Sequence, residues 1–162
     1  MCPKGRAGSS PANRTMKNFF FLSNCDYDYE EKFFLEGPDV TEEEFHKLCG
    51  SLMEQAGMIA LEKSRQSDET YKVVGGSQIM DELVKLLEPH GYKKFRPKEA
   101  SFSGYYLGNM DSYQYMTEGR DGMKPEAEDP RTIHFHLKGA HKAICEHNQV
   151  EYDKVQEARK KK

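Results

Sequence analysis

The run that determines the architecture is Tyr71-Lys-Val-Val-Gly-Gly-Ser-Gln-Ile-Met-Asp-Glu-Leu-Val-Lys-Leu-Leu-Glu-Pro-His-Gly-Tyr-Lys-Lys-Phe-Arg-Pro97. Its first four residues are β-prone, and Gly75-Gly76 ends them. Ser77 is a good N-cap, because its hydroxyl can accept a hydrogen bond from an unsatisfied amide one turn further on. The first half of the run therefore predicts a strand, a glycine turn and the start of a helix.

The second half of this run predicts the helix and a further strand. Between Gln78 and Glu88 apolar residues recur at helical spacing and form one face. Pro89 and Gly91 stop the helix. Tyr92–Arg96 then has the composition of a strand.

Two aromatic-rich strands are expected upstream, at Lys17–Ser23 and Lys32–Glu36. Successive side chains of a strand point to opposite faces, so both strands present apolar residues on both faces. Such strands favour a central position in a sheet. Asn24–Glu31 between them is interpreted as a long hairpin loop.

A long helix is expected to begin after Thr41, because Thr41 and Glu44 have the spacing of a capping box. An apolar stripe continues from Phe45 to about Ser64, which makes this the main helix against the sheet. Gly50 and Gly57 lie on it and suggest close packing.

The C-terminal half predicts strands at Ala100–Leu107 and Thr132–Lys138, separated by a long polar loop at Gly108–Arg131. Gly139 is expected to turn the chain into a final helix from Ala140 to about Arg159, followed by Lys160–Lys162.

These elements predict an α+β fold with a single mixed or mostly antiparallel sheet of about five to six strands. Three helices are expected to pack mainly on one face. Residues 1–15 are rich in Gly, Pro and Ser and are interpreted as a disordered N-terminal extension, and residues 16–162 as a single domain.

The charge balance favours a protein partner over nucleic acid. Residues 1–15 and 154–162 hold eight of the 24 Lys and Arg residues but one of the 27 acids, so the remaining chain has a net charge of −10. An anionic body repels phosphate backbones, and no general nucleic-acid binding is expected.

The lengths of the apolar runs and the spacing of the cysteines indicate the cellular compartment of the protein. The longest apolar run, Phe19–Leu22, is far shorter than the roughly 20 residues of a membrane helix, so no membrane contact is expected. The four cysteines are scattered, which favours free thiols and a cytoplasmic protein.

An acidic, tyrosine-containing segment is the leading candidate for partner binding. It comprises Asp26, Tyr27, Asp28, Tyr29, Glu30 and Glu31. Tyrosine supplies contact area, and the acids complement a basic partner. A solvated loop is the simpler interpretation, and a calcium site is disfavoured because the glycine and the late glutamate of a calcium loop are missing.

Gly75, Gly76 and Ser77 form a second candidate site, for an anion. Amides at a helix start bind phosphate, and glycines let a ligand approach the backbone. The segment lacks both GxGxxG spacing and the Lys-Ser/Thr of a P-loop. A capped turn without any ligand is the alternative.

Histidines near the C-terminus form a third candidate site, for a metal. His134 and His136 share a face of the expected strand, and His141 and Cys145 have i, i+4 spacing on the expected helix. The helix should cover the opposite sheet face, so two separate surface pairs are the simpler interpretation.

The leading hypothesis is a small protein-binding module, regulator or inhibitor-like, that acts through the acidic segment and is not an enzyme. The alternatives are a protein that binds a nucleotide or phosphorylated small molecule at Gly75–Ser77, and a metal-dependent hydrolase using His134 and His136. No cofactor is expected. The partner would be another protein with a basic surface, and a homodimer is also allowed.

Overall fold

The computed structural model describes residues 18–26, 29–94, 105–111 and 136–162. The strands are β1 (Asn18–Asp26), β2 (Tyr29–Gly37), β3 (Lys93–Lys94) and β4 (Tyr105–Asp111). The helices are α2 (Glu42–Gln66), α3 (Gly76–Leu87), the short 3₁₀ turn η1 (Glu88–His90) and α5 (Lys138–Lys160).

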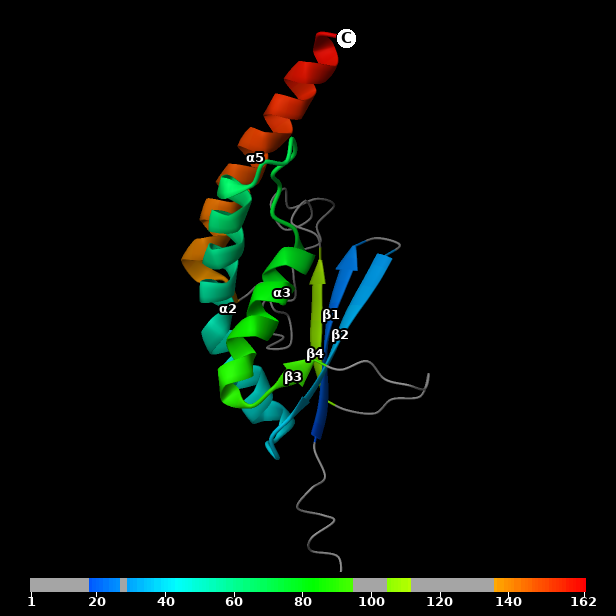
Figure 1. The fold of residues 1–162 in the computed structure, drawn as a ribbon, viewed down its shortest axis with the longest axis vertical. Coiled ribbons are helices and arrows are strands. Elements are labelled where there is room, and N and C mark those ends of the chain that lie inside the picture. The colour runs from blue at the N-terminus through cyan, green and yellow to red at the C-terminus, as the bar shows by residue number, and fades with distance from the viewer. Residues whose placement is uncertain (1–17, 27–28, 95–104, 112–135) are drawn as a thin grey trace, which may run out of the picture.

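The fold is α+β, with one mixed sheet and three α-helices on one side of it (Figure 1). The strand order is β3-β2-β1-β4, in which β1 pairs antiparallel with β2 and parallel with β4, and β2 pairs antiparallel with β3. The predicted class and helix arrangement are confirmed. The described residues contain four strands, so the expected five to six are not confirmed.

The two aromatic strands occupy the two inner positions of the sheet, as their apolar faces predicted. Their register runs without a break from Asn18 opposite Gly37 to Asp26 opposite Tyr29. The long loop predicted at Asn24–Glu31 is therefore wrong, because both strands continue into it. Ladder pairing that starts at the aromatic residues continues through polar residues of low β propensity.

An aromatic cluster joins the sheet to the helices. The ring centroid of Phe20 on β1 lies 4.4 Å from that of Phe45 on α2 and 5.2 Å from that of Tyr92, which follows η1. Phe20 and Phe45 are fully buried. Burial raises the pKa of the Tyr92 phenol to about 12, with smaller contributions from Cys49 and Glu44. Leu22, Phe33 and Leu35 extend this core along the same sheet face.

The predicted capping box begins α2. The Glu44 amide donates to the Thr41 hydroxyl at 3.1 Å, and the Thr41 amide donates to the Glu44 carboxylate at 2.7 Å. The predicted stripe is also confirmed, since Phe45, Cys49, Met53, Ala56 and Ala60 are buried and Leu48, Leu52 and Ile59 are partly buried. No helix among the described residues has the length and apolarity to cross a membrane.

Glycines let α5 approach α2 closely. A Cβ on Gly57 would lie 2.9 Å from a methyl of Leu137 and 3.3 Å from the Cβ of Ala140. A Cβ on Gly50 would lie 2.9 Å from the His136 ring. The close packing predicted at Gly50 and Gly57 is thus confirmed.

Two predictions around α3 need correction. Tyr71–Val74 is not a strand, because its backbone is held by side chains of neighbouring helices and pairs with no strand of the described sheet. Ser77 is not the N-cap. The helix begins at Gly76 after Gly75, whose N–H donates to the Gln78 side chain at 2.8 Å.

Two predictions near the C-terminus also fail. The strand predicted over Thr132–Lys138 is wrong at its end, since His136 lies in a 3₁₀ turn and Lys138 already begins α5. Gly139 is therefore inside the helix and not at a turn. The loop predicted at Gly108–Arg131 is wrong in its first residues, which belong to β4. The remaining parts of both segments, and Ala100–Gly104, lie outside the described residues.

Replacing Gly57 by Val should destabilise the protein by about 1–3 kcal/mol, because the new side chain collides with α5. Met58→Val is the matched control, since Met58 is exposed on the same helix and the change should stay within about 0.5 kcal/mol. Urea unfolding of both variants measures the difference. Equal stabilities would contradict the close contact.

Candidate functional site

The segment between α2 and α3 is held at Val74 by a side chain of α5. The Val74 amide donates to the Asn148 side-chain oxygen at 2.8 Å, and the Asn148 side-chain nitrogen donates to the Val74 carbonyl at 2.9 Å. Val74 is fully buried and Asn148 is 9% exposed. The asparagine thus satisfies both backbone polar groups of the buried residue Val74, as a neighbouring strand would.

The carbonyl of Lys72 forms a second junction in this segment. It accepts a hydrogen bond from the Ser64 hydroxyl on α2 and lies within hydrogen-bond distance of His147 Nε2 on α5. The Lys72 segment, residues 72–74, therefore connects the C-terminal half of α2 to the middle of α5.

Glu151 completes the junction from the next turn of α5. Its carboxylate is nearly buried and lies 2.7 Å from Lys154 Nζ. The hydrogen bond from Lys154 holds the pKa of Glu151 below its usual value against the effect of burial, and the Lys72 backbone also contributes a hydrogen bond. The carboxylate is therefore charged at neutral pH and already paired within the chain.

These contacts leave a groove of about 420 Å³ between α2, the Lys72 segment and α5, called here the α5 groove. Its apolar part consists of Ala143 and Val150, and Val150 is 53% exposed. Its cationic side chains are Arg65, Lys72 and Lys154. The other lining residues are Glu146, His147 and Glu151.

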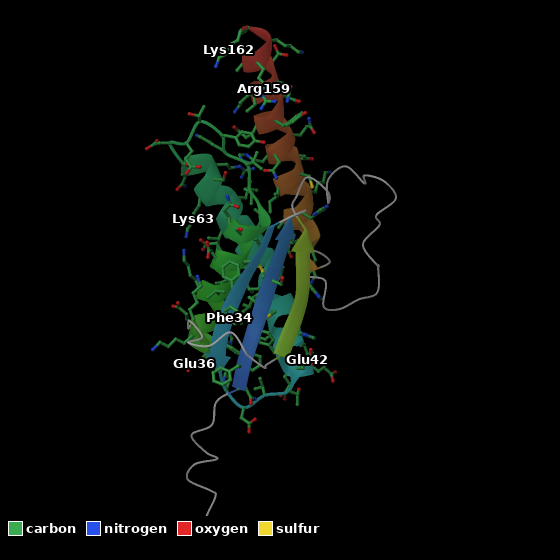
Figure 2. All side chains as sticks on the ribbon, turned by 90° about the vertical axis from the view of Figure 1, so that its right-hand side faces the viewer. Phe34, Glu36, Glu42, Lys63, Arg159 and Lys162 are labelled. Atoms are coloured by element: carbon green, nitrogen blue, oxygen red, sulfur yellow. The ribbon has the colours of Figure 1, made fainter. Side chains whose placement is uncertain are left out.

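One of the two acids in the α5 groove is held within the chain, and the other is exposed. Glu151 is bound to Lys154, and Glu146 lies 3.9 Å from Lys142. Beyond Lys154 the helix continues past the rest of the fold and ends in Arg159 and Lys160–Lys162 (Figures 1 and 2). The groove and this helix end together carry more cations than acids beside the apolar Ala143 and Val150, which suits an acidic ligand with an apolar or aromatic group.

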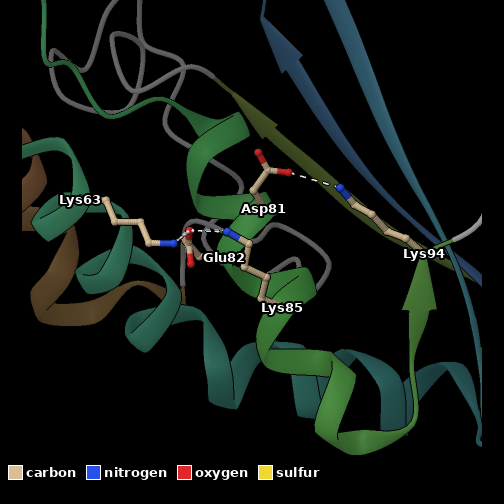
Figure 3. Close-up of polar contacts among 5 residues, drawn as sticks. All are labelled: Lys63, Asp81, Glu82, Lys85 and Lys94. Carbon is tan, nitrogen blue, oxygen red and sulfur yellow. Dashed lines mark hydrogen bonds and ion pairs between the residues drawn. The ribbon is translucent and has the colours of Figure 1, made fainter. Parts of the chain in front are cut away.

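A second hollow of about 280 Å³ lies on the other side of the Lys72 segment. Its most buried charged group is Glu82, 2.6 Å from Lys63 Nζ and 3.2 Å from Lys85 Nζ (Figure 3). Burial alone would raise the pKa of Glu82, but the hydrogen bonds and charges of the two lysines outweigh it and hold this pKa below its usual value.

Gly75, Gly76 and Ser77 lie at the start of α3, as the anion hypothesis requires. The Gly75 amide, however, already donates to Gln78. The lysines of the adjacent hollow, Lys63, Lys72 and Lys85, are balanced there by Glu69, Asp81 and Glu82. This arrangement does not favour an anion over water.

The proposed metal ligands are only partly placed. His134 lies outside the described residues, and the ring of His136 packs against Gly50. The sulfur of Cys145 lies 3.6 Å from His141 Nε2. In the described parts of the chain, no three His, Cys, Asp or Glu side chains gather as metal ligands would.

The two thiols whose placement the structure describes, Cys49 and Cys145, are protonated near pH 7 and therefore are not activated nucleophiles. Burial raises the pKa of Cys145 and lowers the pKa of His141, so both are neutral near pH 7 and do not form a thiolate–imidazolium pair. Burial also raises the pKa of Cys49, which lies in the core.

The acidic segment lies at the end of the β1–β2 hairpin. Asp26 is the last residue of β1, and Tyr29, Glu30 and Glu31 begin β2. Asp26 pairs with Tyr29 and Cys25 with Glu30 along the ladder. Tyr27 and Asp28 lie outside the described residues.

Sequence reasoning missed Asn148 and Glu151, which organise the α5 groove. A signal was present in their spacing, since they continue the stripe of Ala140 and Ile144 at steps of four and three residues. A polar residue at an apolar stripe position indicates a buried hydrogen bond.

Comparison of the chain with protein-family models, with curated proteins and with solved structures gave no match, so its function is inferred from its own geometry.

Replacing Glu82 by Gln should lower stability at neutral pH by about 1 kcal/mol, because two charge-assisted hydrogen bonds are weakened while the exposed lysines regain water. A carboxyl group whose pKa is lower in the folded than in the unfolded protein stabilises the fold at pH values above its unfolded pKa, which is near 4.5. This stabilisation is lost as the pH falls below 4.5 through the folded-state pKa. The stabilities of wild type and variant should therefore converge in acid.

Urea unfolding between neutral pH and the acid range measures this convergence. Glu62→Gln is the control, since Glu62 is an exposed acid of α2 at 3.7 Å from Arg65. A difference between wild type and the Glu82 variant that does not change with pH would contradict the charged pairing.

Proposed function

We propose that this protein is a binding module that recognises a basic surface on another protein through the acidic end of its β1–β2 hairpin. The observation that carries the proposal is the register of β1 and β2, which extends to Asp26 opposite Tyr29. It gives the acidic segment a defined backbone at Asp26 and Tyr29–Glu31, where a loop was expected.

A paired backbone favours binding for an energetic reason. Ordering a flexible segment on association costs conformational entropy. Residues whose backbone is already paired in a β-ladder therefore lose less conformational entropy when a partner binds. The hairpin end supplies three acids, Asp26, Glu30 and Glu31, and one aromatic ring, Tyr29, within two short strand ends. Aromatic contact area beside charge is typical of protein interfaces.

The anionic body supports the same partner chemistry. Outside residues 1–15 and 154–162 the chain has a net charge of −10, which attracts a cationic partner at long range and accelerates association. Because this attraction is screened by salt, binding should weaken as ionic strength increases.

Reversing Asp26 and Glu30 to Lys should abolish capture of the protein's partners. Full-length wild type and variant serve as baits in a native lysate, and captured proteins are identified by mass spectrometry at low and high salt. We expect a set of basic partners that the wild type retains at low salt and the Asp26→Lys, Glu30→Lys variant loses.

The control variant reverses two exposed acids far from the hairpin end in sequence, Asp68→Lys and Glu88→Lys. It carries the same change in net charge and should retain the partners. If the hairpin variant captured the same proteins as the control, the hairpin end would not be the binding surface.

A further inference from the structure

We infer that the α5 groove is the receiving surface for the acidic hairpin end of a second copy of this chain. The inference rests on the proposed function, because it names the partner of the same hairpin. It combines two surfaces of opposite charge that one chain carries: Asp26 and Tyr29–Glu31 on the hairpin, and Arg65 and Lys72 on the groove, where Lys154 is already paired with Glu151.

The chemistry of the two surfaces is complementary in more than charge. The groove has an apolar centre at Ala143 and Val150, with Val150 53% exposed, and cations at Arg65, Lys72 and Lys154. The hairpin end has a tyrosine among carboxylic acids. An aromatic ring on an apolar centre, surrounded by ion pairs, is the composition of a specific protein interface.

Of the two acids in the groove, Glu151 is neutralised within the chain, whereas the pair of Glu146 with Lys142 is at least as exposed as that of Arg65 with Glu62. Glu151 is nearly buried and is bound by Lys154 and by the Lys72 backbone, and Glu146 lies beside Lys142. Among the described residues, Arg65 has an ion pair with the exposed Glu62 at 3.7 Å, a contact that solvent weakens. Beyond the groove, the end of α5 carries Arg159 and Lys160–Lys162, of which Lys160 is paired with Glu157 at 3.3 Å.

The two surfaces cannot meet within one chain. Figure 1 shows the hairpin end in the sheet and the upper half of α5 in the helical layer, well separated, and the groove is built on α5. Both are carried by regular elements, so neither can swing across. A second copy therefore supplies the complementary surface, either reciprocally in a two-fold dimer or head to tail.

The decisive experiment uses two full-length charge-reversal variants, alone and mixed. The hairpin variant carries Asp26→Lys and Glu30→Lys, and the groove variant carries Arg65→Glu and Lys72→Glu. Lys154 is left unchanged because it neutralises the buried Glu151. Sedimentation velocity at about 0.05 M and about 0.5 M salt gives the mass of each species and its dependence on screening.

Wild type should self-associate at low salt and dissociate at high salt. Each variant alone should bind itself at least about tenfold more weakly, because like charges then face each other. Their equimolar mixture should associate again, since the acidic hairpin of one meets the basic groove of the other and the reversed surfaces are also complementary. The control with Asp68→Lys and Glu88→Lys should behave as wild type.

Three results would overturn the inference: a wild type that stays monomeric at all concentrations, a mixture that fails to associate, or self-association that persists in both variants. Failure here is distinguishable from failure of the proposed function. If the wild type is monomeric but still captures basic proteins through its hairpin, the hairpin function stands and only the choice of a second copy is wrong.

Discussion

Two hydrogen bonds between the side chain of Asn148 and the backbone of Val74 are the constraint on which the arrangement of the helices depends. They join Val74, in a loop, to Asn148 of α5, 74 residues further along the chain. Without them, the buried N–H and C=O groups of Val74 would be left unsatisfied. The close contact at Gly57 brings α5 against α2. A glycine contact alone does not fix the position of one helix along the axis of the other. Asn148 fixes that position, and the position of α5 determines the shape of the groove.

The same constraint explains why charged residues are tolerated beside the core. Glu151 is placed by the turn after Asn148 and finds Lys154 and the Lys72 amide. Glu82, on the other side of the Lys72 segment, lies between two lysines from α2 and α3. Each buried carboxylate is paired with lysines whose stems remain partly in water, so charge is neutralised without the full desolvation cost of a buried ion pair.

Local signals in the sequence predicted much of the fold. The Thr41–Glu44 capping box, the apolar stripe of α2 and the two aromatic strands depend on residues a few positions apart, and each is present. The failure at Tyr71–Val74 depends on a distant partner. Val73 and Val74 have β propensity, yet the backbone of Val74 is satisfied by Asn148, and no local pattern contains that contact.

The two surfaces that we propose to interact also differ in how far the sequence could predict them. The acidic hairpin end is contiguous in sequence, so its composition could be recognised, although its strand pairing was not expected. The groove takes Arg65, Lys72 and Lys154 from three separate elements, and none of these residues lies in a recognisable motif. Tertiary contacts of the Lys72 segment with Asn148, Ser64 and His147 bring them together, so local sequence patterns did not reveal the groove.

Native-state hydrogen exchange at the Val74 amide tests this central constraint most directly. If Asn148 holds the segment as described, that amide should open with a free energy close to that of core amides of α2, such as Met53. Exchange of the Val74 amide as fast as that of exposed loop residues Glu69–Tyr71 would contradict the clamp, and the groove that depends on it.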